Sequence, residues 1–461
     1  MARACELMKD ADTIVAIATP QGRGALGLVR MSGPRALSLA EEVFQGKKPL
    51  VPRRVSFGKV VGEGGALLDE VLITYLKAPR SYTGEDVVEL SCHGGRATLS
   101  AVLSLLLSRG ARLAEPGEFT RRAFLNGRLD LLQAEAVADV INAETEASLK
   151  ASLRQLEGGL SNKLEPLWEG MISLSSRLEA TIDFPEDIEE ELEPEALAHE
   201  AEGIIGKLAA LEEGFHRGRL FREGARLAIV GRPNVGKSSL LNALLREERA
   251  IISTLPGTTR DTIEEDAEIR GLPLTIIDTA GLRRGGDEVE RAGIERTRRA
   301  VEAADLILLV LDGSEPLTET DREIALELRG KESVLAVNKV DLPRRLGAKA
   351  LVEFLPGRPA VEISAKEGTG LDALEEAIAS ALLGGGDEGG GALLTRERHR
   401  QAVSRSRERL EAAAQGLRQG LSSELVALEL NEALEALGGL LGRTYGEEVL
   451  DRIFSEFCIG K

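Results

Sequence analysis

The chain has 461 residues, too many for one ordinary hydrophobic core, and its 43% hydrophobic and 29% charged residues are typical of about two to four globular domains. The formal net charge of −18 argues against broad non-specific binding to nucleic acid, because the phosphate backbone would be repelled unless a local basic face exists. Three widely spaced cysteines, Cys5, Cys92 and Cys458, fit neither a disulfide framework nor a zinc site. The longest purely aliphatic run, 306–311, is too short to cross a bilayer, so we expect a soluble cytoplasmic protein.

Residues 1–126 alternate short apolar segments with glycine turns, which predicts an N-terminal α+β domain. We expect strands at 13–18, 27–31, 71–76 and 87–92, and a helix at 97–107. Polar residues interrupt this pattern at Arg30, in the turn 83–86 and at 93–95. Taken alone, each of them is more often a turn or strand-end residue than a ligand.

From residue 127 the pattern becomes helical. Leucine and methionine recur at alternating steps of four and three between Leu149 and Leu178, which predicts one stripe of a long helix that Gly158, Gly159 and Pro166 should weaken or bend. The acidic run 186–195 indicates a solvated linker or a helix start.

A second helical segment, with apolar positions such as Leu421, Leu425 and Leu428, closes the chain. The segments 127–222 and 387–461 therefore suggest one helical domain with another domain inserted, which the short distance between a domain's termini permits. Two separate bundles are less favoured, since each half offers few helices to cover its stripe.

The inserted domain, residues 223–386, begins with the most informative stretch of the chain. The apolar run 227–230 leads into GRPNVGKSS at 231–239. A strand, a glycine-rich loop and a helix start in that order predict a P-loop, in which backbone N–H groups and the helix N-terminus face phosphates. Lys237 would reach the β and γ phosphates, and the hydroxyl of Ser238 would bind Mg²⁺.

Further strands are expected at 274–278, 306–312, 334–338 and 361–364, with helical stretches between them. This alternation predicts a doubly wound α/β sheet, whose ligands bind at the carboxyl ends of the strands. The glycine-rich tract 384–391 is typical of a flexible linker.

Three more motifs follow strands in this domain: DTAG at 278–281, NKVD at 338–341 and SAK at 364–366. Asp278 would hold Mg²⁺ through water, and the N–H of Gly281 would sense the γ phosphate. The carboxylate of Asp341 can accept bonds from the N1–H and amino group of guanine, a pair of donors that adenine lacks, while the SAK segment offers an N–H to guanine O6. The four motifs together predict a GTPase.

The attacking water needs an orienting group, yet the residue after the switch glycine is Leu282, where Ras-like enzymes have glutamine. Asp287, Glu288 and Glu290 are candidates, although each fits a solvated helix start equally well. No arginine finger can be assigned among Arg283, Arg284 and Arg291. Asn234 with the loop 253–261 could instead form an oxygen cage for a monovalent cation, and Thr259 is a natural second Mg²⁺ hydroxyl.

At this point the sequence resembles the MnmE (TrmE) family of tRNA modification GTPases over nearly its whole length. The resemblance is carried by these motifs together with DTIVA from Asp12, TGED from Thr83, HGG from His93, PGEFT from Pro116, RAFLN from Arg122, LDLLQAEA from Leu129, DEVERxGIER from Asp287 and the terminal FCIGK. The departures are about ten extra residues at the start, Ser253 where threonine is common, Cys92 before His93 and the glycine tract. Serine keeps a hydroxyl and a carbonyl, so a cation site there is not put in doubt.

The resemblance implies a multidomain fold: an α+β folate-binding and dimerisation domain, an all-α helical domain, and an inserted Ras-like α/β GTPase domain. It implies a homodimer and a tetrahydrofolate donor, either the 5,10-methylene or the 5-formyl derivative. With the FAD-dependent partner MnmG, in a heterotetramer, the family installs an aminomethyl or carboxymethylaminomethyl group at C5 of the wobble uridine of certain tRNAs.

The resemblance also assigns residues. It implies folate contacts at Arg30, Glu85, Arg128 and Lys461. It implies K⁺ ligands at Asn234, Ser253, Leu255 and Thr258, Mg²⁺ ligands at Ser238 and Thr259, and a water-orienting acid at Glu290. The predicted GTP-binding residues are Asn234, Val235, Gly236, Lys237, Ser238, Ser239, Ser253, Thr254, Leu255, Pro256, Gly257, Thr258, Thr259, Asp278, Thr279, Ala280, Gly281, Asn338, Lys339, Val340, Asp341, Ser364, Ala365 and Lys366.

Two questions stay open from sequence. Cys458 is either a catalytic thiol near the folate or a small buried residue beside Phe457. The function is either wobble-uridine modification or regulation by a GTPase that binds ribosomal or other RNA without modification chemistry. An arginine cluster could face RNA phosphates, although a solvated helix face is the commoner outcome. Its members are Arg396, Arg398, Arg400, Arg405, Arg407 and Arg409.

Overall fold

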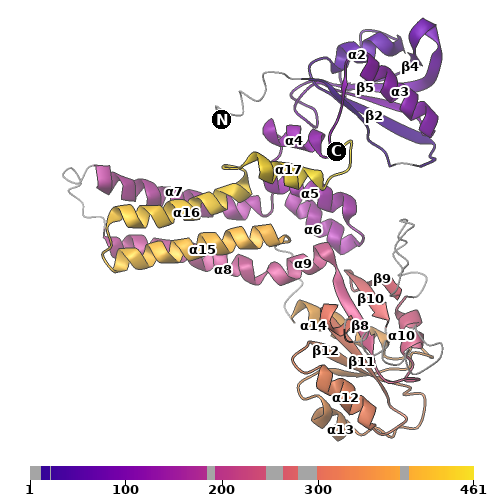
Figure 1. Cartoon of the computed structure of the whole chain (residues 1–461), viewed down its shortest axis with the longest axis vertical. Coiled ribbons are helices and arrows are strands. Elements are labelled where there is room, and N and C mark those ends of the chain that lie inside the picture. The colour runs from indigo at the N-terminus through magenta and orange to yellow at the C-terminus, as the bar shows by residue number, and fades with distance from the viewer. Residues whose placement is uncertain are drawn as a thin grey trace. The chain divides into compact units, whose positions relative to one another are not determined.

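The computed structural model describes residues 12–20, 22–183, 193–245, 263–278, 298, 300–384 and 394–461. The chain forms two compact units, each assembled from separate stretches of sequence (Figure 1). One comprises Met1–Ile141, Gln155–Ala198 and Ala412–Lys461, and the other comprises Asn142–Arg154 and His199–Glu411. No helix in the described ranges combines the length and apolar character that crossing a bilayer requires.

The first unit contains a seven-stranded sheet with the order β3-β4-β5-β6-β2-β1-β7. Its strands are β1 (Ile14–Ile17), β2 (Leu26–Ser32), β3 (Phe44–Gly46), β4 (Val55–Val61), β5 (Leu67–Leu76), β6 (Val87–His93) and β7 (Arg112–Leu113). Alternate residues of the central strands, such as Val29, Met31 and Val88, are buried against α2 (Ala36–Val43) and α3 (Arg96–Ser108). The α+β prediction is confirmed here, although α2, β3, β4 and β7 were not foreseen.

The helices of this unit are α4 (Glu118–Leu125), α5 (Leu131–Asn142), α7 (Ser161–Asp183), α16 (Ser423–Leu441) and α17 (Glu447–Ser455). The pair α7 and α16 runs antiparallel, because Ser175 contacts Asn431 at 3.3 Å whereas Thr181 contacts Ser423 at 3.5 Å. Segments from both ends of the predicted insertion therefore pack together, as one interrupted helical domain requires.

The single long helix predicted across Leu149–Leu178 is wrong. The chain forms α6 (Glu146–Leu156) and then α7, and Gly158 between them adopts φ +87°, a left-handed conformation that ends a helix. The stripe residues on α7 are buried as expected, namely Leu164, Leu167, Met171, Leu174 and Leu178, with Leu160 directly before the helix. Leu149 and Leu153 on α6 are 36% and 40% exposed. The start of α6 is held elsewhere, since the hydroxyl of Thr145 bonds the carbonyl of Gly271 at 2.9 Å.

The second unit is built on a six-stranded sheet with the order β13-β12-β11-β8-β10-β9. Its strands are β8 (Ala225–Val230), β9 (Ile263–Ile269), β10 (Leu272–Asp278), β11 (Leu306–Asp312), β12 (Ser333–Asn338) and β13 (Ala360–Glu362). All neighbours pair in parallel except β9, an antiparallel edge strand that the sequence analysis missed. The predicted doubly wound α/β fold is confirmed.

Helices cover both faces of this sheet, and every residue of β11 is buried, as expected of a central parallel strand. The helices that precede, follow or lie between its strands are α9 (Phe215–Glu223), α10 (Lys237–Leu244), α12 (Glu319–Glu327), α13 (Ala348–Phe354) and α14 (Leu371–Leu383), and most of α8 (Pro194–Glu213) and α15 (Glu397–Arg418) also belongs to this unit. The division into two units falls inside α5, α6, α8 and α15. The parallel strands bring the carboxyl ends of β8, β10, β11 and β12 to one edge, where the nucleotide motifs lie.

We predict that Gly370→Ala destabilises the second unit far more than Gly384→Ala. Both glycines flank α14 with similar left-handed φ values of +74° and +71°. A Cβ on Gly370 would lie 2.2 Å from the carbonyl oxygen of Glu362, whereas no atom of the described residues lies within 4 Å of one on Gly384. The expected cost is about 1 kcal/mol at Gly384 and about 3 kcal/mol or more at Gly370. Thermal unfolding of both variants measures this, and equal midpoints would contradict it.

Candidate functional site

The P-loop connects the end of β8 to the start of α10. Gly231 and Gly236 have φ values of +150° and +99°, and a Cβ would lie 2.4 Å from the carbonyl oxygen of Val310 at the first and 2.2 Å from Nδ2 of Asn338 at the second. Both positions therefore require glycine. The buried Lys237 donates from Nζ to the carbonyls of Gly231 at 2.8 Å and Arg232 at 2.9 Å. Its charge is thus held inside the loop, as binding a polyphosphate would require.

The segments after β12 and β13 meet the P-loop through Asn338, which is only 3% exposed. Its Nδ2 donates to the carbonyl of Val235 at 2.8 Å, and its Oδ1 accepts the N–H of Ala365 at 3.0 Å. The hydroxyl of Ser364 donates to Asp341 at 2.8 Å. The structure therefore brings three of the predicted GTP-binding segments, 234–239, 338–341 and 364–366, to one place.

Lys339 adopts φ +66° and donates from Nζ to the carboxylate of Asp312 at 2.6 Å. Burial by itself would raise the pKa of Asp312, but bonds from Lys339 and Ser314 outweigh it, so the pKa lies below its usual value. Asp312 was not foreseen from the sequence, although its position at the end of a wholly apolar strand was a signal.

The P-loop has a second unforeseen anchor at Arg232. Its guanidinium pairs with Glu315 at 2.5 Å and with the buried Asp321 at 3.4 Å. Asp321 also closes a capping box with Thr318 at the start of α12. These contacts connect the P-loop to the N-terminus of α12.

Several predicted nucleotide-site residues fall outside the described part of the chain. They are Ser253, Thr254, Leu255, Pro256, Gly257, Thr258, Thr259, Thr279, Ala280, Gly281 and Glu290. Asp278 is the last residue of β10. Asn234 and Ser238 are described, and both are exposed at the loop and the start of α10. The roles predicted for these residues stay predictions.

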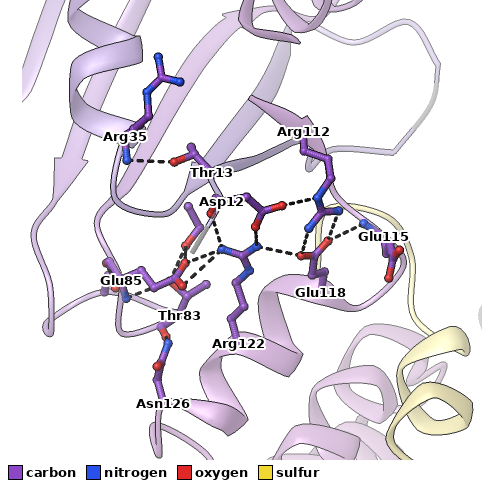
Figure 2. A network of polar contacts seen from close by, with 12 residues as sticks. Asp12, Thr13, Arg35, Thr83, Glu85, Arg112, Glu115, Glu118, Arg122 and Asn126 are labelled. Atoms are coloured by element: carbon purple, nitrogen blue, oxygen red, sulfur yellow. Dashed lines mark hydrogen bonds and ion pairs between the residues drawn. The ribbon is translucent and has the colours of Figure 1, made fainter. Parts of the chain in front are cut away.

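A second polar centre lies in the first unit, around the turn 81–85 between β5 and β6 (Figure 2). The carboxylate of Glu85 accepts a bond from Ser32 at 2.7 Å, and the hydroxyls of Ser32 and Thr83 lie 2.6 Å apart. Arg128 donates from Nε to the carbonyl of Ser81 at 3.2 Å. Two predicted folate residues, Glu85 and Arg128, therefore border the same turn.

The other two, Arg30 and Lys461, meet beside this turn. The Arg30 guanidinium lies 5.7 Å from the ring centroids of both Tyr82 and Phe119, and it donates to the carbonyl of Gly460 at 3.2 Å. The N–H of Phe119 donates to the carbonyl of Lys461 at 3.2 Å. Burial, followed by the nearby charge of Arg30, lowers the pKa of Lys461. The C-terminal residues are thus docked against the N-terminal sheet.

Two family models match the chain: one described as the MnmE helical domain, over residues 131–458, and one described as the GTP-binding protein TrmE N-terminus, over residues 13–128. A protein of Geobacillus kaustophilus (strain HTA426) named tRNA modification GTPase MnmE is 44% identical over 98% of this chain and all of its own length. One of Symbiobacterium thermophilum with the same name is 47% identical over 98% of this chain and 99% of its own.

The chain belongs to the MnmE family.

The family prediction is confirmed. Because the relatives align over nearly their full length, the MnmE assignment covers both compact units and not the P-loop alone.

The structure excludes one of the two roles that the sequence left open for Cys458 in the MnmE motif at the C-terminus. Cys458 is exposed, so the buried packing role beside Phe457 is wrong. Of the two cysteines in the described ranges, Cys92 is the buried one, and burial together with the charge of Asp69 raises its pKa to about 12. A thiol of that kind is unreactive near neutral pH.

The arginine cluster 396–409, at the start of α15, does not form an open basic face. Arg396 is 9% exposed. Arg400 pairs with Glu397 at 2.5 Å, and Arg407 pairs with Glu212 at 2.9 Å and Glu411 at 2.5 Å. Acidic neighbours offset the cationic charge that phosphate contacts would need, as the solvated-helix alternative predicts.

Near the turn 81–85, Asp12, Arg112, Glu118 and Arg122 form an ion network that was not foreseen from the sequence (Figure 2). Burial would raise the pKa values of Asp12 and Glu118, but the bonds from Arg112 and Arg122 outweigh it, and both pKa values are lowered. The DTIVA, PGEFT and RAFLN motifs, which contain Asp12, Glu118 and Arg122, were the only sequence features that pointed to this network.

We predict that Glu118→Gln weakens the acid sensitivity of the first unit. A carboxylate whose folded pKa lies below its unfolded value of about 4.3 stabilises the fold above that value, and this stabilisation is lost as pH falls through the folded pKa. Urea unfolding between neutral and acidic pH should therefore show a smaller acid-induced loss in this variant, together with lower stability at neutral pH.

The matched control is Glu115→Gln, because Glu115 is exposed. It should keep the acid response of the unaltered protein. Equal acid-induced losses in Glu118→Gln and the unaltered protein would show that Glu118 does not contribute as argued.

Proposed function

We propose that the chain is a K⁺-dependent GTPase that works as a homodimer with an FAD-dependent partner of the MnmG type. In this proposal it installs an aminomethyl or carboxymethylaminomethyl group at C5 of the wobble uridine of certain tRNAs, in the cytoplasm, with a tetrahydrofolate one-carbon donor. The observation that carries it is full-length similarity to relatives named tRNA modification GTPases. The proposal retains the division into residues 1–126, 127–222, 223–386 and 387–461.

The nucleotide half of the proposal has support in the geometry around Asn338. Its amide joins the P-loop to the 364–366 segment, and Ser364 orients Asp341, which would accept the two adjacent donors of guanine. The N–H of Ala365 is already donated to Asn338, so a bond to guanine O6 from this segment would come from a neighbouring N–H. GTP is therefore the nucleotide that these residues suit.

The residues present also fit the proposed cations. The exposed hydroxyl of Ser238 at the start of α10 would hold Mg²⁺, with Thr259 as the second hydroxyl. Asn234 adopts φ +64° in the loop and is exposed, so its amide oxygen is available to K⁺ together with Ser253, Leu255 and Thr258. Bound there, K⁺ would supply the positive charge that an arginine finger supplies elsewhere.

The folate half rests on the surroundings of the turn 81–85. Three cations, Arg30, Arg128 and Lys461, and the carboxylate of Glu85 border one region. A reduced folate has carboxylates at one end and N–H donors on its pterin at the other, which is the complementary set of groups. When bound, the folate would supply the one-carbon unit, while these residues would hold and orient it.

Two measurements test the proposal as a whole. Purified protein should retain a reduced folate, and a strain lacking the chain should lose the modified wobble nucleoside. If that strain instead shows a ribosomal defect while the modification of its wobble uridine is unchanged, the chain is a regulatory GTPase and the proposed modification role is overturned.

Replacing K⁺ by Na⁺ at equal ionic strength should reduce GTP hydrolysis by about tenfold or more, because a smaller ion fits poorly in a cage built for the larger one. Steady-state phosphate release measures the effect. Equal rates in the two salts would remove the cation from the mechanism.

Glu290→Ala should keep GTP affinity but reduce turnover by about hundredfold, as expected for loss of a group that orients the attacking water. Asp287→Ala and Glu288→Ala are the matched controls, and both should retain turnover. If one of them loses turnover and Glu290→Ala does not, the water-orienting role belongs to that neighbour.

A further inference from the structure

The guanidinium of Arg122 on α4 lies among three carboxylates, with its side chain 13% exposed (Figure 2). Its Nη2 donates to Asp12 at 2.6 Å and to Glu118 at 2.9 Å. Its Nη1 donates to the carbonyl of Asp12 at 3.0 Å and to the two carboxylate oxygens of Glu85 at 3.1 and 3.3 Å. One side chain thus bridges the segment that precedes β1, α4 and the turn 81–85.

The three carboxylates do not depend on Arg122 equally. Asp12 and Glu118 are also paired with Arg112, and Glu118 accepts the N–H of Glu115 at 2.8 Å as well. Within the described part of the chain, Arg122 is the one cation paired with Glu85, and Ser32 supplies its other side-chain bond. Removing Arg122 would therefore change the surroundings of Glu85 most.

The backbone of Glu85 is held by the turn itself. The hydroxyl of Ser81 donates to the carbonyl of Glu85 at 2.5 Å, and the N–H of Glu85 donates to Thr83 at 3.2 Å. Gly84 adopts φ +81°, and a Cβ there would lie 3.0 Å from Cβ of Asn126. With the backbone fixed, the direction of the carboxylate depends on the partners of its side chain, Arg122 and Ser32.

We propose that Arg122 is a positioning residue of the reduced-folate site, which holds the Glu85 carboxylate in the orientation that receives the N–H donors of the ligand. This inference rests on the proposed function, because it assumes that Glu85 binds folate. Arg122 acts through Glu85 and need not touch the ligand. A side chain placed within hydrogen-bond reach but turned away loses most of its contribution to binding, so positioning decides affinity.

The test is a double-mutant cycle on the full chain, with 5-formyltetrahydrofolate as the probe and titration calorimetry as the measurement. Arg122→Gln should raise the dissociation constant by about ten- to hundredfold, as expected when a charged hydrogen-bonding partner is lost. In a Glu85→Gln background the same substitution should cause little further loss, because the group that Arg122 positions is already altered. A merely structural role would weaken binding equally in both backgrounds.

Arg112→Gln is the matched control. It removes a cation from the same cluster, from Asp12 and Glu118, but Arg112 makes no contact with Glu85 in the described residues. It should lower the unfolding midpoint and leave folate affinity close to that of the unaltered protein. Equal loss of folate affinity in Arg112→Gln and Arg122→Gln would overturn the inference.

If Arg122→Gln does not fold, Arg122→Lys carries the same cycle. A single ammonium keeps the charge but cannot bond all three carboxylates at once, so it should weaken binding by about three- to tenfold. A lysine variant with unchanged affinity would overturn the inference. If the unaltered protein itself binds no 5-formyltetrahydrofolate, the proposed folate function fails and this inference with it, whereas tight binding that survives Arg122→Gln overturns the inference alone.

Discussion

The side-chain amide of Asn338 joins two loops that are about 130 residues from each other in sequence, and the proposed nucleotide site depends on it. One buried group satisfies both the carbonyl of Val235 in the P-loop and the N–H of Ala365 after β13. Because buried backbone groups without partners are costly, the two loops keep their relative position as long as this amide is in place. Gly236 is required for the same reason, since a Cβ would collide with Nδ2 of Asn338.

In the first unit, paired charges join separate segments of the chain, as the amide of Asn338 does in the second unit. Two arginines, Arg112 and Arg122, lie among three carboxylates, so each buried charge has opposite charges beside it. The C-terminal residues add to this arrangement, because the carbonyl of Gly460 bonds Arg30 and a Cβ at Gly460 would lie 2.7 Å from the carbonyl oxygen of Ile17.

Much of the second unit could be predicted because its signals are local. The strand, glycine loop and helix start of the P-loop follow one another within about a dozen residues, and parallel strands place their carboxyl ends at a common edge. The same logic failed for the stripe Leu149–Leu178, where the leucine spacing continues across Gly158 but the helix does not. Side-chain periodicity reports which face is apolar and says little about where the backbone turns, so Gly158 was expected to weaken or bend the helix and not to end it.

By itself, the sequence determined the family, the fold classes of both sheets and the order of the nucleotide motifs, because each of these is written in consecutive residues. The tertiary structure alone decided that Asp312 anchors Lys339, that Arg122 bonds Glu85, and that the last residues of the chain reach Arg30. Each of these contacts joins two residues that no periodicity and no motif in the sequence connects. Their partners are determined by packing and by the need to pair buried charges, and both depend on which residues the fold brings together.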